Sequence, residues 1–211
     1  MTDEIGFSRP PAEKGGPRNL FNPARDGLPE VLAVSLVGFM GAGKTTVGRA
    51  LATRLGWRFE DLDDLIQARE GRSIEQIFQQ QGELAFRDLE HLLVHELLTT
   101  AKSSPMVLAL GGGAFLLEPV QHALRDAKIP TVFLDAPVEE LFRRSEQPDV
   151  VRPLRRDREQ FYELCELRLP AYLEAELRIE TGGKAVSTVV EEIISALGLV
   201  PRSHPGSGVC E

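Results

Sequence analysis

The chain is poor in cysteine and in long apolar segments. Only Cys165 and Cys210 occur among its 211 residues, too few for the disulfide framework of a small secreted protein. We expect Cys165 in or near the core and Cys210 in a loose tail. No apolar run approaches the roughly 18 residues of a membrane-spanning helix, and the first residues lack a charged-then-apolar leader. These absences predict a cytoplasmic protein in a reducing compartment.

Basic residues are also in deficit. The chain has 24 Lys and Arg against 32 Asp and Glu, a net charge of −8. This deficit argues against nucleic acid as a partner, because phosphate backbones are bound by basic surfaces. An anionic nucleotide is not excluded, since basic residues concentrated in one cleft can hold it. The hydrophobic content of 42% is ordinary for a globular protein, and the length predicts about one to one and a half domains.

Both ends of the chain differ in composition from the middle. Residues 1–29 are rich in proline, glycine and charge without periodicity, which predicts a flexible extension. Residues 199–211 have the same character and are predicted to form a flexible tail. The folded domain is therefore expected over residues 30–198.

Short apolar runs alternate with helical patterns in this domain. Strands are expected at 31–37, 57–60, 106–110, 131–135 and 177–181. Helices are expected from Lys44 to a stop at Gly56, from a capping box of Ser73 and Gln76, from about Glu83 to Thr100, at Pro137, and from Ser187 to a stop at Gly198. The alternation is typical of a parallel sheet with helices on both faces.

A phosphate-loop pattern, G-x-x-x-x-G-K-S/T, follows the first apolar run as GFMGAGKT, residues 38–45. Its glycines allow successive backbone N–H groups to point at phosphate oxygens, and the helix that follows adds a favourable dipole. Lys44 would reach the β- and γ-phosphates, and the Thr45 hydroxyl would bind Mg²⁺. The residues expected to contact the nucleotide include Gly41, Ala42, Gly43, Lys44, Thr45 and Thr46.

Acidic residues and glycines follow two of the expected strands. Asp61 and Asp63 alternate, so on an extended chain they would point the same way, which suits a Mg²⁺ partner and a base for a hydroxyl. Acids are also favoured in the first turn of a helix, and the residues leave both interpretations open. Three glycines in LGGGA (110–114) exceed what a tight turn needs, and indicate close approach of the backbone to a ligand or another segment.

Arginines stand singly in apolar or acidic surroundings. Arg87, Arg152 and Arg168 each suit a surface ion pair, or a carboxylate or phosphate held by the planar guanidinium. The polar, Arg-rich segment EQPDVVRPLRRDRE is typical of a mobile lid over a nucleotide. His91 and His95 have i, i+4 spacing but lack the acidic neighbour of the H-E-x-x-H zinc motif, so we interpret them as part of a helix face.

These segments, taken in order, resemble the shikimate kinase family. The segments after the phosphate loop are DLDDLI (61–66), GRSIEQIF (71–78), GELAFRDLE (82–90), LALGGGA (108–114) and RPL (152–154), at close to the family's spacing over residues 31–198. The resemblance implies an ATP-dependent kinase that phosphorylates the 3-hydroxyl of shikimate in the chorismate pathway. It also implies an α/β P-loop kinase with a five-stranded parallel sheet in the order 2-3-1-4-5, a substrate-binding helical region at about 62–90 and a lid at about 146–158.

The resemblance also implies roles for residues that bind the acceptor and the metal. Asp61 corresponds to the aspartate that holds Mg²⁺, usually through water. Asp63 corresponds to the aspartate that binds ring hydroxyls and takes the proton from the attacking one. Arg87 and Arg168 correspond to the pair that grips the substrate carboxylate. The glycines expected to assist them are Gly111, Gly112 and Gly113.

Two more arginines are implied on the nucleotide side. Arg152 corresponds to the lid arginine that closes on the transferring phosphoryl group, and is expected to act in catalysis with Lys44 and Asp63. Arg144 corresponds to an arginine stacked near adenine, although this chain is one residue longer between Arg144 and Arg152. The family is often monomeric, which implies a monomer with shikimate and ATP as its small-molecule partners.

Two other functions compete with this one. A gluconate kinase of the same fold would need a different pocket, although the set of Asp63, Arg87 and Arg168 does not exclude every sugar acid. A regulatory module that binds shikimate or nucleotide without turnover is disfavoured, because none of the catalytic groups named above is missing. The N-terminal extension is also too short for a DNA-binding domain.

Overall fold

The computed structural model describes residues 31–101, 104–146 and 158–201. The expected N-terminal extension, most of the C-terminal tail, and all but the ends of the expected lid, with Arg152, lie outside these residues. Within them, the strands are β1 (Ala33–Val37), β2 (Arg58–Asp61), β3 (Met106–Ala109), β4 (Thr131–Asp135) and β5 (Leu177–Glu180). The helices are α2 (Lys44–Leu55), α3 (Leu62–Glu70), α4 (Ile74–Ala101), α5 (Glu118–Asp126), α6 (Val138–Ser145), α7 (Arg158–Tyr172) and α8 (Val186–Leu197), with a 3₁₀ turn η1 (Ala114–Leu116).

The five strands form one parallel sheet in the order β2-β3-β1-β4-β5, which confirms the expected fold. The central strand is β1, whose Ser35 lies opposite Leu108 of β3 and Thr131 of β4. Parallel strands end at the same edge of a sheet, and ligands of open α/β folds bind outside that edge. The phosphate loop, the two aspartates and the three glycines follow β1, β2 and β3, so all of them meet there.

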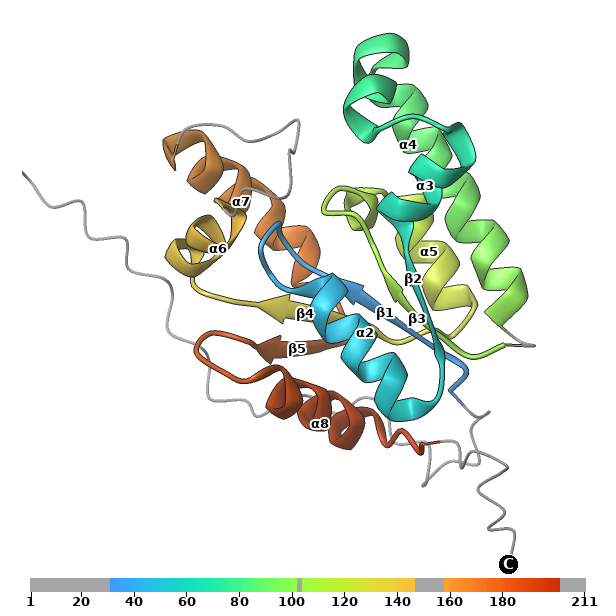
Figure 1. Cartoon of the computed structure of the whole chain (residues 1–211), viewed down its shortest axis with the longest axis vertical. Coiled ribbons are helices and arrows are strands. Elements are labelled where there is room, and N and C mark those ends of the chain that lie inside the picture. The colour runs from blue at the N-terminus through green and yellow to red at the C-terminus, as the bar shows by residue number, and fades with distance from the viewer. Residues whose placement is uncertain (1–30, 102–103, 147–157, 202–211) are drawn as a thin grey trace, which may run out of the picture.

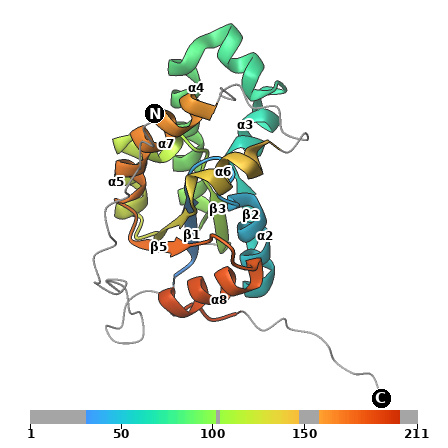
Figure 2. The same ribbon diagram turned by 90° about the vertical axis from the view of Figure 1, so that its left-hand side faces the viewer.

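Helices cover both faces of the sheet, as the alternation of elements predicted (Figure 1). On one side α2 packs on α8, whereas α4, α5 and α7 meet around η1. Figure 2 shows α5 and α7 on one side of the strands and α2 on the other. Burial on both faces explains why β1, β3 and β4 are almost continuously apolar. Fully inaccessible core side chains include Val34, Leu36, Leu108, Leu124 and Val132.

The helix α4 consists of two helices joined at a break. Gly82 has a φ of 83° and a ψ of 175°, which are not helical. The short helix before it begins with the predicted capping box: Ser73 N donates to Gln76 Oε1 (2.9 Å) and Gln76 N donates to Ser73 Oγ (3.2 Å). The longer helix after it begins at Glu83, as expected. Figure 1 shows that α3 and this short first part of α4 project beyond the sheet.

The ends of two other helices also follow the sequence. Gly56 and Gly198 cap α2 and α8 in the left-handed conformation, as predicted. Cys165 is half-buried and packs against the core, whereas Cys210 lies outside the described residues. The sequence patterns assigned no range to α5 or α7. Within the described ranges, no helix is long and apolar enough to cross a membrane.

Candidate functional site

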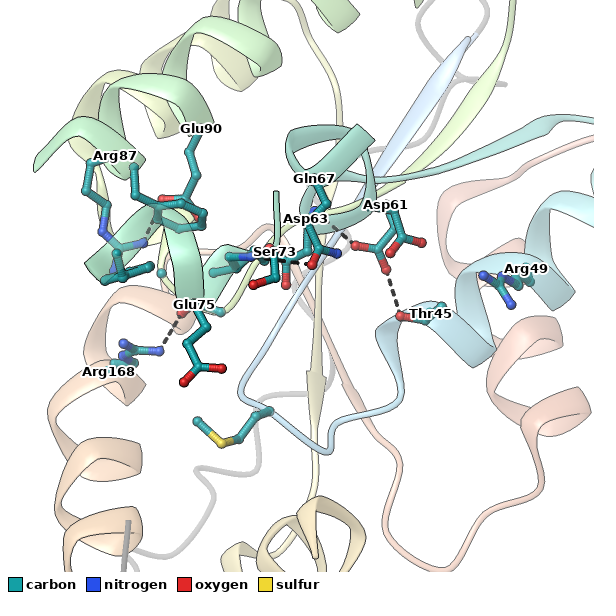
Figure 3. Close-up of a pocket in the computed structure, with 17 residues that line it drawn as sticks. Thr45, Arg49, Asp61, Asp63, Gln67, Ser73, Glu75, Arg87, Glu90 and Arg168 are labelled. Atoms are coloured by element: carbon teal, nitrogen blue, oxygen red, sulfur yellow. Dashed lines mark hydrogen bonds and ion pairs between the residues drawn. The ribbon is translucent and has the colours of Figure 1, made fainter. Parts of the chain in front are cut away.

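A cavity of about 450 Å³ lies where the segments after β1, β2 and β3 meet (Figure 3). Its volume suits a small metabolite rather than a macromolecule. Its walls come from the phosphate loop, α2, α3, the start and middle of α4, the glycine turn and α7. The residues that line it are Met40, Thr45, Arg49, Asp61, Asp63, Asp64, Gln67, Ser73, Ile74, Glu75, Phe78, Phe86, Arg87, Glu90, Gly112, Gly113 and Arg168.

The phosphate loop has the backbone that its glycines predict. Gly38, Gly41 and Gly43 have φ angles of 144°, 81° and 90°, in the region that favours glycine. Lys44 Nζ donates to the carbonyl oxygens of Gly38 (2.9 Å) and Phe39 (3.2 Å), so its ammonium group lies over the loop. The N-terminus of α2 has no side-chain cap, which leaves backbone N–H groups for an anion.

Thr45, Asp61 and Asp63 form a chain of hydrogen bonds beside the loop. Thr45 Oγ1 donates to Asp61 Oδ2 (2.7 Å), and the backbone N–H of Asp63 donates to Asp61 Oδ1 (3.1 Å). Asp61 caps α3 and Asp63 lies in its first turn, so the expectation that both point the same way on an extended chain is wrong. The helix-start interpretation is correct. Both carboxylates nevertheless line the cavity.

The oxygens of Thr45 and Asp61 fit one side of a Mg²⁺ shell. Mg²⁺ usually keeps several waters and takes one or two protein oxygens together with substrate phosphates. The two side chains lie close enough for a direct hydrogen bond, so both can border one ion. In the part of the chain that the structure describes, no three His, Cys, Asp or Glu side chains gather as a metal site.

Arg87, on α4, is held by two glutamates of unequal exposure. Its Nη1 lies 2.6 Å from Glu90 Oε2, and its Nη2 lies 2.8 Å from Glu83 Oε1. The Glu90 side chain is 1% exposed, whereas the Glu83 side chain is 65% exposed. Because a solvated ion pair contributes little free energy, Glu83 is the partner that a ligand carboxylate can replace.

Arg168 comes from α7, far from Arg87 in the sequence, and is buried. Its Nη1 donates to the Gly112 carbonyl (3.1 Å), and its guanidinium carbon lies 5.8 Å from the centre of the Phe39 ring. The Tyr172 hydroxyl donates to the same carbonyl. Burial raises the pKa of Tyr172 to about 12, so the hydroxyl keeps its proton. Figure 3 shows Arg87 and Arg168 on the same side of Asp63.

The glycine turn confirms the predicted close approach of backbone to another segment. A Cβ atom on Gly111 would lie 2.5 Å from Asp63 Oδ1, and one on Gly113 would lie 2.2 Å from Arg87 Nη1. At both positions a Cβ atom would fit only if the neighbouring side chain moved away. Gly112 is less crowded, since its nearest neighbour, an Arg168 nitrogen, would be 3.4 Å away.

Glu90 is a residue of the site to which the sequence analysis gave no role. Burial raises its pKa to about 7, although the neighbouring Arg87 acts in the opposite direction. Asp63 faces the same point above Gly111 and adds to the rise. Glu90 lies three residues after Arg87, on the same face of the helix, and this spacing was the signal that could have found it.

The raised pKa of Glu90 predicts a loss of stability with rising pH. The unfolded chain releases this proton near the ordinary value of 4.5, whereas the folded chain holds it to about pH 7. Between these values the folded state binds more protons, so the free energy of unfolding falls, by about 3 kcal/mol for this group. We expect urea denaturation to show this slope in the wild type and not in Glu90→Gln. Equal slopes in both proteins would contradict the assignment.

Arg144 lies beside the phosphate loop rather than in the cavity. It sits in the last turn of α6, where Nη1 donates weakly to the Gly41 carbonyl (3.5 Å) and Nη2 pairs with Glu140 (2.6 Å). Thr46 lies in the first turn of α2 and is exposed. Arg144 and Thr46 therefore lie beside the phosphate loop but do not line the cavity. Arg152 belongs to the segment outside the described residues.

Comparison with known proteins agrees with this geometry. The sequence model of the shikimate kinase family matches residues 40–198. Shikimate kinases of Caulobacter vibrioides and Persephonella marina are 45% and 37% identical, over 78% of this chain in each case and over 81% and 98% of their own lengths. The solved structure of shikimate kinase from Acinetobacter baumannii in complex with shikimate is 36% identical, with a TM-score of 0.71 over 77% of this chain and 90% of that one. The chain belongs to the shikimate kinase family.

Proposed function

We propose that the chain transfers the γ-phosphoryl group of ATP to the 3-hydroxyl of shikimate, giving shikimate 3-phosphate and ADP in the chorismate pathway of aromatic amino acid biosynthesis. One observation carries this proposal. Arg87 and Arg168, from different helices, lie in one cavity with Asp63, and that cavity adjoins a complete phosphate loop. A relative of the same fold that binds shikimate supports the choice of acceptor.

The cavity supplies what a small hydroxylated carboxylic acid needs. The guanidinium groups of Arg87 and Arg168 bind the carboxylate, and each can donate two parallel hydrogen bonds to it. Backbone N–H groups of the glycine turn assist them. Asp63 accepts hydrogen bonds from ring hydroxyls, and so fixes which hydroxyl faces the phosphate loop. Phe78 and Phe86 cover the apolar side of the ring.

The phosphate loop and its neighbours bind the nucleotide. Backbone N–H groups of residues 41–46 and the Lys44 ammonium group bind the phosphates, and Arg144 lies beside the adenine. Thr45 and Asp61 would hold Mg²⁺. The ion, when bound, neutralises charge on the β- and γ-phosphate oxygens. Arg152 places a positive charge beside the phosphoryl group during its transfer.

Asp63 takes the proton from the 3-hydroxyl group while the oxygen of that hydroxyl attacks the γ-phosphorus of ATP. Phosphoryl transfer depends on positioning and charge stabilisation more than on covalent chemistry. The arginines orient the acceptor, and Lys44 stabilises charge that develops on the phosphoryl oxygens. Each charge acts more strongly in a site from which water is excluded.

Release of ADP tests this function. The chain is incubated with ATP and Mg²⁺, with and without shikimate, and the phosphorylated product is identified by ³¹P NMR. We expect turnover that depends on shikimate and a phosphate ester at the 3-position. Turnover with gluconate in its place would identify a different kinase. Nucleotide binding without turnover on either acid would identify a regulatory module.

A methyl group on Gly113 is expected to weaken shikimate binding. In Gly113→Ala the new carbon would displace the Arg87 guanidinium from its present place between Glu83 and Glu90. We expect KM for shikimate to rise by about tenfold or more, while KM for ATP stays near its wild-type value. Gly112→Ala, which meets only ordinary contacts, is the matched comparison and should have a smaller effect. The reverse order would contradict the close approach at Gly113.

A further inference from the structure

Two histidines on α4 face each other outside the catalytic cavity. Nε2 of His91 lies 3.1 Å from Nε2 of His95, and the two rings are perpendicular with their centres 4.6 Å apart. Both side chains contact solvent, and neither lines the cavity. Their i, i+4 spacing on a regular helix fixes the two rings side by side. The two rings can form a hydrogen bond only when one of these nitrogens carries a proton and the other does not.

The separation of the two nitrogens suits a shared metal ion. With metal–nitrogen bonds of about 2.0–2.1 Å, a nitrogen–nitrogen distance of 3.1 Å gives an N–metal–N angle of about 95–102°. This angle lies between the values of about 90° and about 109° in octahedral and tetrahedral shells. Both rings can therefore reach one ion after rotations of their side chains that turn the two nitrogens toward it, and water completes the shell.

Asp88 favours a cation beside the pair, and Arg87, four residues before His91, is already paired with Glu83. Asp88 is exposed and lies one turn before His91 on the same face of α4, where its carboxylate lowers the local potential. The side of the helix away from the two rings is buried against the core through Leu93 and Leu97. This packing holds the helix, and hence the spacing of the two rings, in place before an ion binds. Such preorganisation reduces the entropy that binding would otherwise cost.

We propose that His91 and His95 together bind a divalent transition-metal ion of the Zn²⁺, Ni²⁺ or Cu²⁺ class. Imidazole nitrogen is a preferred ligand of these ions and a poor ligand of Mg²⁺. The site is therefore chemically distinct from the oxygen-rich position at Thr45 and Asp61. It lies on the helix that carries Arg87 and Glu90, so a bound ion would stabilise that helix from its outer side.

Calorimetric titration of the untagged chain with NiCl₂ and ZnCl₂, in excess Mg²⁺, tests the site. We expect one ion per chain, with affinities in the order of the transition-metal series, Ni²⁺ above Co²⁺ above Mn²⁺. Either His91→Ala or His95→Ala should weaken binding by about tenfold or more, because the second ligand of a chelate acts at high effective concentration. At free Ni²⁺ ten times the dissociation constant, the unfolding equilibrium constant should fall about elevenfold.

His122→Ala provides the matched control, since it removes a single exposed histidine from α5 and should leave the titration unchanged. The His91→Ala/His95→Ala variant should keep the wild-type circular dichroism spectrum and shikimate-dependent turnover, because neither ring lines the cavity. Unchanged Ni²⁺ binding in this double variant would overturn the proposal. Complete displacement of Ni²⁺ by Mg²⁺ would also overturn it, since the ion would then be bound by carboxylates.

Discussion

Replacement of Asp63 by asparagine is expected to lower kcat by about 10²- to 10⁴-fold, the usual contribution of a general base. Asparagine keeps the shape of the side chain and its ability to bind ring hydroxyls, but its amide cannot take a proton at neutral pH. The Asp61 cap of α3 depends only on the backbone N–H of residue 63, so the helix should remain intact. Steady-state kinetics of shikimate phosphorylation measure the effect, with KM for both substrates changing much less than kcat.

Asp64→Asn is the matched control for this substitution. Asp64 is the next residue and lies in the same turn of α3; it also borders the cavity, but its side chain is exposed. Loss of an exposed charge changes free energies by about 0.5 kcal/mol or less, which corresponds to roughly twofold in rate. Similar losses of kcat in both variants would mean that the negative potential of the site, rather than proton transfer to Asp63, drives the reaction. Full activity of Asp63→Asn would exclude Asp63 as the base.

Replacement of Arg168 by leucine is expected to raise KM for shikimate by about 30-fold or more. Loss of one member of a buried, hydrogen-bonded charge pair costs about 2–5 kcal/mol of binding free energy, because the other charge remains desolvated. Arg168 is buried beside Phe39 and donates to the Gly112 carbonyl, so no water can easily take its place. Leucine fills part of the volume of the arginine stem. The measurement is the KM for shikimate and for ATP in the purified variant.

The carboxamide of shikimate distinguishes a carboxylate contact from a packing defect. The wild type should bind the amide much more weakly than the acid, whereas Arg168→Leu should bind both with similar affinity. Arg158→Leu, at the exposed first turn of the same helix, should leave both affinities unchanged. If Arg168→Leu weakened the acid and the amide by the same factor, Arg168 would act through packing alone.

Features set by neighbouring residues were predictable from the sequence. The phosphate loop, the glycine ends of α2 and α8, and the capping box of Ser73 and Gln76 each depend on a few adjacent residues with specific backbone requirements. The strands β1, β3 and β4 were predictable because burial on both faces leaves continuous apolar runs. The family resemblance then supplied the order of the strands, which local patterns do not contain.

Features set by contacts between distant segments were not predictable in this way. Whether Asp63 lies on a strand or a helix depends on where β2 ends, and β2 ends with its last pair to β3, Asp61 opposite Ala109. The importance of Glu90 depends on its burial against Arg87 and the glycine turn, because a lone glutamate in a helix is usually solvated. The helix α7 was not predicted because it contains Pro170 and because its apolar residues do not repeat clearly at helical spacing.

The exposed pair between Arg87 and Glu83 makes acceptor binding an exchange of anions. Before substrate binds, the Glu83 carboxylate already lies against the guanidinium group, so an incoming carboxylate replaces it and the local charge changes little. Exchange of one counterion for another releases less electrostatic free energy than the filling of a bare cationic site, and depends less on ionic strength. Glu83 thus sets a minimum affinity that a carboxylate must exceed, so chloride and other weakly held anions should compete poorly for Arg87.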